Sequence, residues 1–90
     1  MPYDITKYSF DQAKRLGVHI QPSTLKNYKI DVFDKDGNYK TSIGDCRYSD
    51  FPHYIESHGI DYAKKRQSLY HSRHYHDKSE RGILAIKILW

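Results

Sequence analysis

The sequence predicts a small α+β domain in which a β-hairpin packs against two or three C-terminal helices. Residues 28–33 alternate in the manner of a strand and lead into an Asp-Gly turn, which indicates a hairpin. From residue 50 onward, capping residues, glycines and helically spaced side chains indicate helices. Ninety residues correspond to one domain. We divide it into an N-terminal arm (1–9), a short helix plus hairpin (10–46) and a helical half (50–90).

The N-terminal elements are expected to be short. Residues 1–9 show no regular period and are interpreted as an arm. Ser9 is the predicted N-cap of a helix over residues 10–16, because a serine hydroxyl accepts a hydrogen bond from the first turn, and Gly17 ends that helix. Residues 18–20 are prone to β structure, and residues 21–24 predict a turn.

The hairpin is the clearest local signal. Tyr28, Ile30 and Val32 are expected on one face of its first strand, and residues 39–43 are expected to return as the second. The turn between the strands superficially resembles a calcium loop. Its Gly37 is displaced from the position such a loop needs, and no glutamate closes it, so we interpret it as an ordinary turn.

The helical half divides at glycines. Asp50 is the predicted N-cap of a helix that ends near residue 57, with Pro52 in its first turn. Gly59 separates this helix from a longer one over residues 60–75. Residues 77–82 predict a loop. The apolar run at residues 83–90 is compatible with either helix or strand; we favour a helix that packs on the hairpin and the long helix.

The long helix carries a stripe of aromatic rings and guanidinium groups rather than an apolar stripe. Its members are Tyr62, Arg66, Tyr70, Arg73 and His74. For the two arginines we favour an internal role, in which they lie across tyrosine rings and pair with Asp45 or Asp50. An external anion is the alternative. We assign binding of an external partner or anion to another set: Arg47, Tyr54, Lys64, Lys65, His71 and Lys78.

Charge is distributed unevenly along the chain. Residues 1–61 hold eight basic and nine acidic side chains, whereas residues 62–90 hold seven basic and two acidic ones, a balance of +5. A one-sided basic surface favours nucleic acid or an acidic protein face; a solvated charged helix is the plain alternative. No 18-residue apolar run and no hydrophobic signal core occur in the sequence, so we expect no membrane span.

Residues that suggest catalysis or metal binding form no familiar pattern. The histidines do not match zinc-ligand spacing, and the single Cys46 predicts a reducing compartment without an intrachain disulfide. Nothing in the sequence marks Cys46 as a nucleophile, because no helix start follows it directly. We therefore predict no enzymatic activity, no catalytic residue, no metal, no cofactor and no small-molecule substrate. A metal-dependent nuclease that uses the histidines is a third hypothesis.

A set of short motifs resembles a family of small proteins encoded by nucleocytoplasmic large DNA viruses and some phages. The motifs cover residues 10–90 and depart from the family pattern at Arg66-Gln67 and at Gly82-Ile83-Leu84-Ala85. They are Ala13-Lys14-Arg15-Leu16-Gly17-Val18, Pro22-Ser23-Thr24, Gly44-Asp45, Tyr48-Ser49-Asp50-Phe51-Pro52, Tyr54, Gly59, Ala63, Arg66, Tyr70, Arg73-His74 and Ile88-Leu89-Trp90. The resemblance implies a viral origin and a compact, non-enzymatic domain.

Together, the resemblance and the basic C-terminal third lead to two functional hypotheses. The first is a small basic virion component, a minor capsid protein that bridges viral coat proteins or lies between coat and genome. The second is a nucleic-acid-binding protein that acts in viral replication or packaging. Both predict synthesis in the host cytoplasm, and the first predicts residence in the virion.

Overall fold

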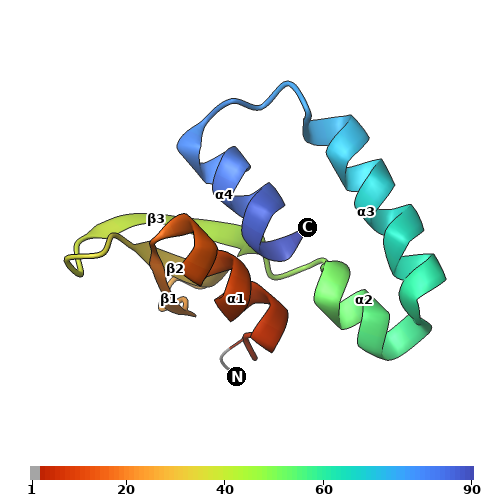
Figure 1. Ribbon diagram of the computed structural model, residues 1–90, viewed down its shortest axis with the longest axis horizontal. Helices are drawn as coiled ribbons and strands as arrows, with labels where there is room; N and C mark the ends of the chain where they lie inside the picture. Colours follow the sequence, from red (N-terminus) through yellow and green to blue (C-terminus); the bar gives the residue numbers. More distant parts are fainter. Residues whose placement is uncertain (1–2) are drawn as a thin grey trace.

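The computed structural model describes residues 3–90 and confirms the small α+β fold (Figure 1). A three-stranded antiparallel sheet follows the first helix, and three further helices complete the chain. In chain order the elements are α1 (Lys7–Leu16), β1 (His19–Pro22), β2 (Tyr28–Phe33), β3 (Tyr39–Asp45), α2 (Phe51–His58), α3 (Ile60–His74) and α4 (Glu80–Leu89).

The predicted hairpin is β2 and β3, and it gains a third strand. Ile30 lies opposite Ile43 in the β2–β3 ladder, and β1 pairs with the other edge of β2 to give the order β1-β2-β3. The Asp34 carboxylate accepts the backbone N–H groups of Asp36 and Asn38, both at 2.9 Å, which stabilises the turn. The two strands are therefore joined by the Asp-Gly turn that the sequence predicts.

The core lies between the sheet and two helices. α4 packs against β3 and α1, and α1 also contacts β1. The tail prediction is confirmed in part: the segment is a helix on the hairpin, but α4 does not pack broadly on α3, and the link to α3 is made by Trp90. The buried apolar cluster consists of Ala13, Ile30, Val32, Ile43, Leu84, Ala85, Ile88 and Leu89. At 25 cal/mol per Å2, burial of such side chains supplies most of the driving force for folding a domain of this size.

Both faces of β2 are buried, which differs from the single buried face expected. Lys29 and Asp31 are as inaccessible as their apolar neighbours. Asp31 accepts hydrogen bonds from the hydroxyls of Ser23 and Ser42, each at 2.6 Å. Burial opposes ionisation of this carboxyl, but these hydroxyl donors and the Thr24 backbone N–H outweigh it and lower the pKa of Asp31. The second face is therefore satisfied by polar partners rather than by water.

Two predicted helix starts are wrong, the first because Ser9 makes a tertiary contact and the second because Ser79 forms a local cap. Thr6, not Ser9, caps α1, and its side chain accepts the backbone N–H of Ser9 at 3.3 Å. The Ser9 hydroxyl is buried instead and donates to the Ile88 carbonyl at 2.9 Å. Helix α4 begins at Glu80 with Ser79 as its cap, so part of the expected loop at residues 77–82 is helical.

Other N-terminal expectations also change. The arm ends where α1 begins at Lys7, and both Tyr3 and Ile5 pack against the core. The arm's residues 1–2 lie outside the described part of the chain. The turn predicted over residues 21–24 is half strand, because Gln21 and Pro22 belong to β1. A proline fits this place because β1 is an edge strand.

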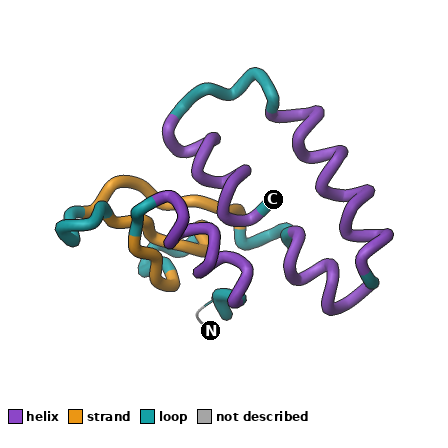
Figure 2. Tube along the Cα trace, in the orientation of Figure 1, coloured by secondary structure: helices purple, strands orange, loops and turns teal. Residues whose placement is uncertain are grey.

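Helices α2 and α3 form a helical hairpin to one side of the sheet (Figure 2). Asp50 caps α2 as predicted, and Gly59, with a φ of 88°, separates the two helices. α3 buries only Ala63 completely. The predicted stripe is therefore only partly internal: Arg66, Tyr70 and His74 are half-buried, whereas Tyr62 and Arg73 are exposed.

The C-terminal residue connects α3 to the rest of the molecule. The Gln67 side-chain amide donates to the Trp90 carbonyl at 2.5 Å, and the Tyr70 ring stacks on the Trp90 ring at a centroid distance of 4.3 Å. Within residues 3–90, no helix combines the length and apolarity that crossing a bilayer would require.

Candidate functional site

A cleft of about 760 Å3 lies between α3 on one side and α4 with the ends of β2 and β3 on the other. We call it the basic cleft. Its size is typical of sites that receive a ligand or part of a polymer. The lining residues are Asn27, Tyr28, Lys29, Gly44, Asp45, Arg47, Tyr48, Ser49, Tyr54, Arg66, Leu69, Tyr70, Arg73, His74, Asp77, Arg81, Gly82, Ala85, Leu89 and Trp90.

Positive charge predominates in the basic cleft. One lysine and four arginines face two aspartates there, a balance of 5 − 2 = +3 with histidine neutral. Lys29 and Arg47 have carboxylate partners, at 2.9 and 2.7 Å. Within residues 3–90, the remaining three cations have no carboxylate within ion-pair distance. These three are Arg66, Arg73 and Arg81, and their guanidiniums are the ones available to an anion.

Three ring–guanidinium pairs line the same cleft. The guanidinium carbon lies 5.7 Å from the ring centroid for Arg47 and Tyr48, and 5.6 Å for Arg66 and Tyr54. The third pair, Arg81 over Tyr28, has a distance of 5.1 Å. Each pair places a fixed positive charge beside an aromatic surface. The same pairing of an arginine with a tyrosine ring therefore occurs three times in the cleft, on α2, α3, α4, the sheet and the segment after β3.

A stack of aromatic rings forms the α3 end of the cleft. Tyr70 lies between Trp90, at 4.3 Å and 6° between ring planes, and His74, at 4.2 Å and 26°. Burial, with a smaller contribution from the charge of Asp77, raises the pKa of the Tyr70 phenol. Both faces of this ring are occupied, so its role is to hold α3 against the C-terminal residue.

Asp45 and Arg47 form an exposed pair at the mouth of the cleft. The guanidinium donates to both carboxylate oxygens, with the shortest contact at 2.7 Å. Hydrogen bonds from the Arg47 side chain and backbone lower the pKa of Asp45 to about 2. The carboxylate is ionised at neutral pH and fixes Arg47 beside Tyr48.

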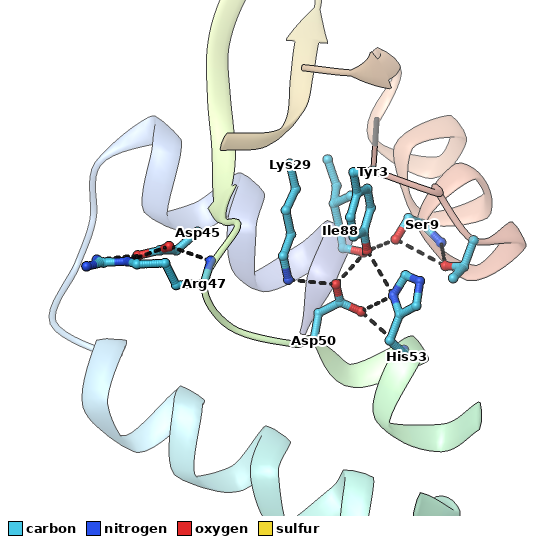
Figure 3. Close-up of polar contacts among 9 residues, drawn as sticks. Tyr3, Ser9, Lys29, Asp45, Arg47, Asp50, His53 and Ile88 are labelled. Atoms are coloured by element: carbon cyan, nitrogen blue, oxygen red, sulfur yellow. Dashed lines mark hydrogen bonds and ion pairs between the residues drawn. The ribbon is translucent and has the colours of Figure 1, made fainter. Parts of the chain in front are cut away.

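A buried polar cluster surrounds Asp50 (Figure 3). It shares Lys29 with the lining of the cleft. The Asp50 carboxylate accepts from Lys29 Nζ at 2.9 Å and from the Tyr3 hydroxyl at 2.5 Å. The His53 backbone N–H and ring Nδ1 also contact it, at 3.2 and 2.8 Å. This cluster joins β2, the start of α2 and the N-terminal segment at one point.

Electrostatics keep the cluster ionic. Burial opposes the charge on Asp50, but the Lys29 ammonium and the surrounding hydrogen bonds outweigh it and lower the pKa of Asp50. Burial and the adjacent Asp50 carboxylate raise the pKa of Tyr3. Every buried side-chain nitrogen and oxygen in residues 3–90 has a hydrogen-bond partner. The cluster therefore holds the N-terminal segment, β2 and α2 together through satisfied hydrogen bonds.

The structure corrects the expected ionic partners of the long-helix arginines. Asp45 pairs with Arg47, and Asp50 pairs with Lys29. Arg66 lies over the Tyr54 ring but has no carboxylate partner within residues 3–90, and Arg73 is exposed. Lys29 extends from β2 and already pairs with the buried Asp50 carboxylate, so no arginine of α3 pairs with it.

The basic cleft collects some of the site residues expected from the sequence and leaves others outside. Brought together are Arg47, Tyr54, Arg66, Tyr70, Arg73 and His74. Lys64, Lys65, His71 and Lys78 are exposed and do not line it. His71 Nε2 instead lies 3.2 Å from the Trp90 carbonyl oxygen. Tyr62 stacks on the His58 ring at 4.4 Å, also away from the cleft.

Sequence reasoning missed many residues of the cleft, among them Tyr28, Arg81 and Trp90. The sequence pattern predicts only that Tyr28 shares a strand face with Ile30 and Val32, whereas in the structure the Arg81 guanidinium lies over its ring. Arg81 was placed in a loop; recognising Ser79 as a helix cap would have put it in the first turn of α4. Trp90 was interpreted only as a packing residue. The pairs Arg66–Tyr54 and Arg81–Tyr28 join residues of different helices and strands, so no local sequence pattern predicts them.

The described residues bring no three His, Cys, Asp or Glu side chains together as a metal site would require. Cys46 is exposed, and its sulfur lies 3.6 Å from the Lys26 carbonyl oxygen. The guanidiniums and rings that line the basic cleft are suited to non-covalent contacts with an anion that carries rings.

Comparison with known proteins adds no relative to this description. No protein-family model matches the chain, and no curated protein or solved structure matches it. The resemblance to the viral family stays a prediction from the sequence motifs.

Proposed function

We propose that this chain is a non-enzymatic nucleic-acid-binding protein that holds its partner in the basic cleft. The observation that carries the proposal is the meeting of Arg66, Arg73 and Arg81, which have no carboxylate partner within residues 3–90, with three ring–guanidinium pairs in one concave site.

Phosphate and base are the two chemical groups that such a lining serves. A guanidinium binds phosphate oxygens through two parallel N–H donors and stays charged at any physiological pH. Aromatic side chains stack on bases regardless of their identity. The balance of +3 in the cleft attracts a polyanion over the distance of the Debye length, about 8 Å at physiological salt.

A virion component that bridges coat proteins is the second candidate. Exposed apolar and aromatic side chains on and beside α3 favour it, because rings and aliphatic groups form the centres of protein interfaces. They are Ile60, Tyr62 and Tyr75, none of which lines the basic cleft. The two candidates are compatible in one molecule, with the basic cleft toward the genome and this surface toward the coat. Viral origin itself depends on the sequence resemblance.

The proposal is tested by titrating the protein into a fluorescein-labelled oligonucleotide and following anisotropy at several salt concentrations. Affinity should fall steeply with salt, because each phosphate contact releases counterions. The triple variant Arg66→Ala, Arg73→Ala, Arg81→Ala should bind at least about tenfold more weakly and show a shallower salt slope, by about one per lost contact.

The matched control removes the same charge outside the cleft: Lys64→Ala, Lys65→Ala, Lys78→Ala. We expect this variant to keep most of the affinity. Equal loss in both triple variants would mean that net charge alone attracts the polymer and that the cleft has no special role. Absence of binding by the unaltered protein at low salt would refute the proposal and favour the coat-protein candidate.

A further inference from the structure

We infer that the basic cleft takes single-stranded rather than double-stranded nucleic acid, with unpaired bases stacked on its tyrosine rings. This inference depends on the proposed function and specifies the form of the polymer. The observation behind it is the position of the rings, which lie inside the concave site next to the guanidiniums rather than on a flat face.

A duplex cannot present to the cleft what its lining recognises. In double-stranded nucleic acid the base faces are covered by their neighbours, and only base edges and phosphates are accessible. In a single strand, base faces and phosphates are accessible together. A cleft of about 760 Å3 also falls in the range of small-ligand sites, so it can hold a few nucleotides but not a helix.

The rings of the cleft differ in their freedom to stack. Tyr70 is covered by His74 and Trp90, so it is occupied. Tyr28 and Tyr54 are half-buried. Tyr48 is 64% exposed and follows Arg47 directly in the segment after β3. It has the most ring surface to offer to a base, and no helix or strand depends on it.

The arginines of α3 are spaced for a polymer rather than for one nucleotide. Arg66 and Arg73 are seven residues apart (73 − 66 = 7), which corresponds to about 10 Å along the helix axis. Two guanidiniums at this separation contact different phosphates. Arg81 belongs to α4, which lies apart from α3 in the ribbon (Figure 1). Residues of both helices line the cleft. A strand running between the two helices meets cations on both walls.

The experiment compares single strands with a duplex at one fixed salt concentration. The probes are labelled dT12 and rU12, with dT12 annealed to dA12 as the duplex. We expect the single strands to bind at least tenfold more tightly. Thymidine monophosphate should compete only at much higher concentration, because it offers one phosphate. Fluorescence of Trp90, the chain's single tryptophan, provides a label-free readout beside the cleft.

Tyr48→Ala tests the stacking residue. Its affinity for dT12 should fall about fivefold to a hundredfold, the range for loss of one base–ring stack, while duplex binding stays constant. Tyr48→Phe should bind like the unaltered protein. Tyr75→Ala is the matched control, since Tyr75 is 61% exposed but does not line the cleft. It should leave both affinities unchanged. Thermal unfolding verifies that all three variants fold.

The outcomes separate this inference from the proposed function. Equal affinity for single strand and duplex, or an equal effect of Tyr48→Ala on both, overturns the single-strand inference and leaves nucleic-acid binding in place. Failure of the unaltered protein to bind any of the probes overturns both.

Discussion

Replacing Asp50 by asparagine should strongly destabilise the protein, because Asp50 is a buried carboxylate paired with a buried lysine. The substitution preserves shape, and asparagine caps helices about as well as aspartate, so α2 keeps its N-cap. What it removes is the negative charge that Lys29 Nζ contacts at 2.9 Å. If the amide oxygen keeps the cap to His53, the amide NH2 also replaces the oxygen that accepts from Lys29 and Tyr3. The two side chains are 1% and 6% exposed. The lysine is then left charged and buried without a counterion.

The expected cost follows from that burial. Removing one partner of a buried ion pair costs about 3–5 kcal/mol, because the other partner has lost its water and gains nothing in return. A domain of this size has a total stability of about 5–15 kcal/mol. Each kcal/mol shifts the melting temperature of a domain this small by about 4–8 °C. We therefore expect Asp50→Asn to lower the melting temperature by at least about 12 °C.

Urea unfolding followed by circular dichroism and Trp90 fluorescence measures the effect. Asp11→Asn is the control, because it removes the same charge from the exposed Lys7–Asp11 pair, whose side chains are 89% and 52% exposed. That change should cost about 0.3–0.5 kcal/mol. The double variant Lys29→Met, Asp50→Asn should recover most of the loss, since no charge is then left buried. A similar midpoint for Asp50→Asn and Asp11→Asn would refute the argument.

Three further predictions concern acid stability, a backbone contact and a buried hydroxyl. Because the pKa of Asp50 is lower in the folded than in the unfolded state, its contribution is complete above about pH 4 and is lost as pH falls through the folded value; urea midpoints from pH 7 to 2 should fall, and less so in Asp50→Asn. Gly44→Ala should cost more than Gly37→Ala in the same assay: both glycines have positive φ, but a Cβ at Gly44 would lie 2.7 Å from Leu89 Cδ1, and one at Gly37 meets nothing within 4 Å. Ser9→Ala should cost about 1–3 kcal/mol, because it leaves a buried carbonyl of α4 unpaired; a melting temperature equal to that of the unaltered protein would contradict this.

Local signals in the sequence were enough for elements whose causes are local. Residues 28–33 alternate and are followed by Asp-Gly, and β2 has the predicted bounds. Asp50 precedes Phe51-Pro52, and it caps α2 at the predicted place. In both cases the residues that determine the structure lie within a few positions of it, so one stretch of chain contains the whole cause.

Prediction from the sequence failed where the local structure depends on a contact with a distant residue. Thr6 and Ser9 are both acceptable caps, and only the Ile88 carbonyl, 79 positions away, assigns Ser9 to the core. The length of β1 was predicted too short for the same reason, because Gln21 and Pro22 are strand residues only through their pairing with β2. Such choices depend on packing that no local pattern contains.

Prediction of the site was limited by competition for carboxylates. From the sequence alone, Asp45 and Asp50 could pair with any of several lysines and arginines. Which pairs form depends on the tertiary structure. Lys29 on β2 pairs with Asp50. Arg47 pairs with Asp45, which lies two residues before it. The arginines of α3 were thereby left without carboxylate partners in the described chain, which the expected internal pairing did not foresee.

The low burial of α3 links the fold to the proposed function. A helix that buries only Ala63 completely gains little from packing on a sheet, so it is held by α2 and by the Trp90 contacts instead. The space it leaves beside α4 is the basic cleft. Since Arg73 is exposed and stabilises no buried partner, Arg73→Ala should leave the free energy of unfolding within about 0.5 kcal/mol. Binding and folding are then separable at this residue, in contrast to Lys29, whose charge the core requires.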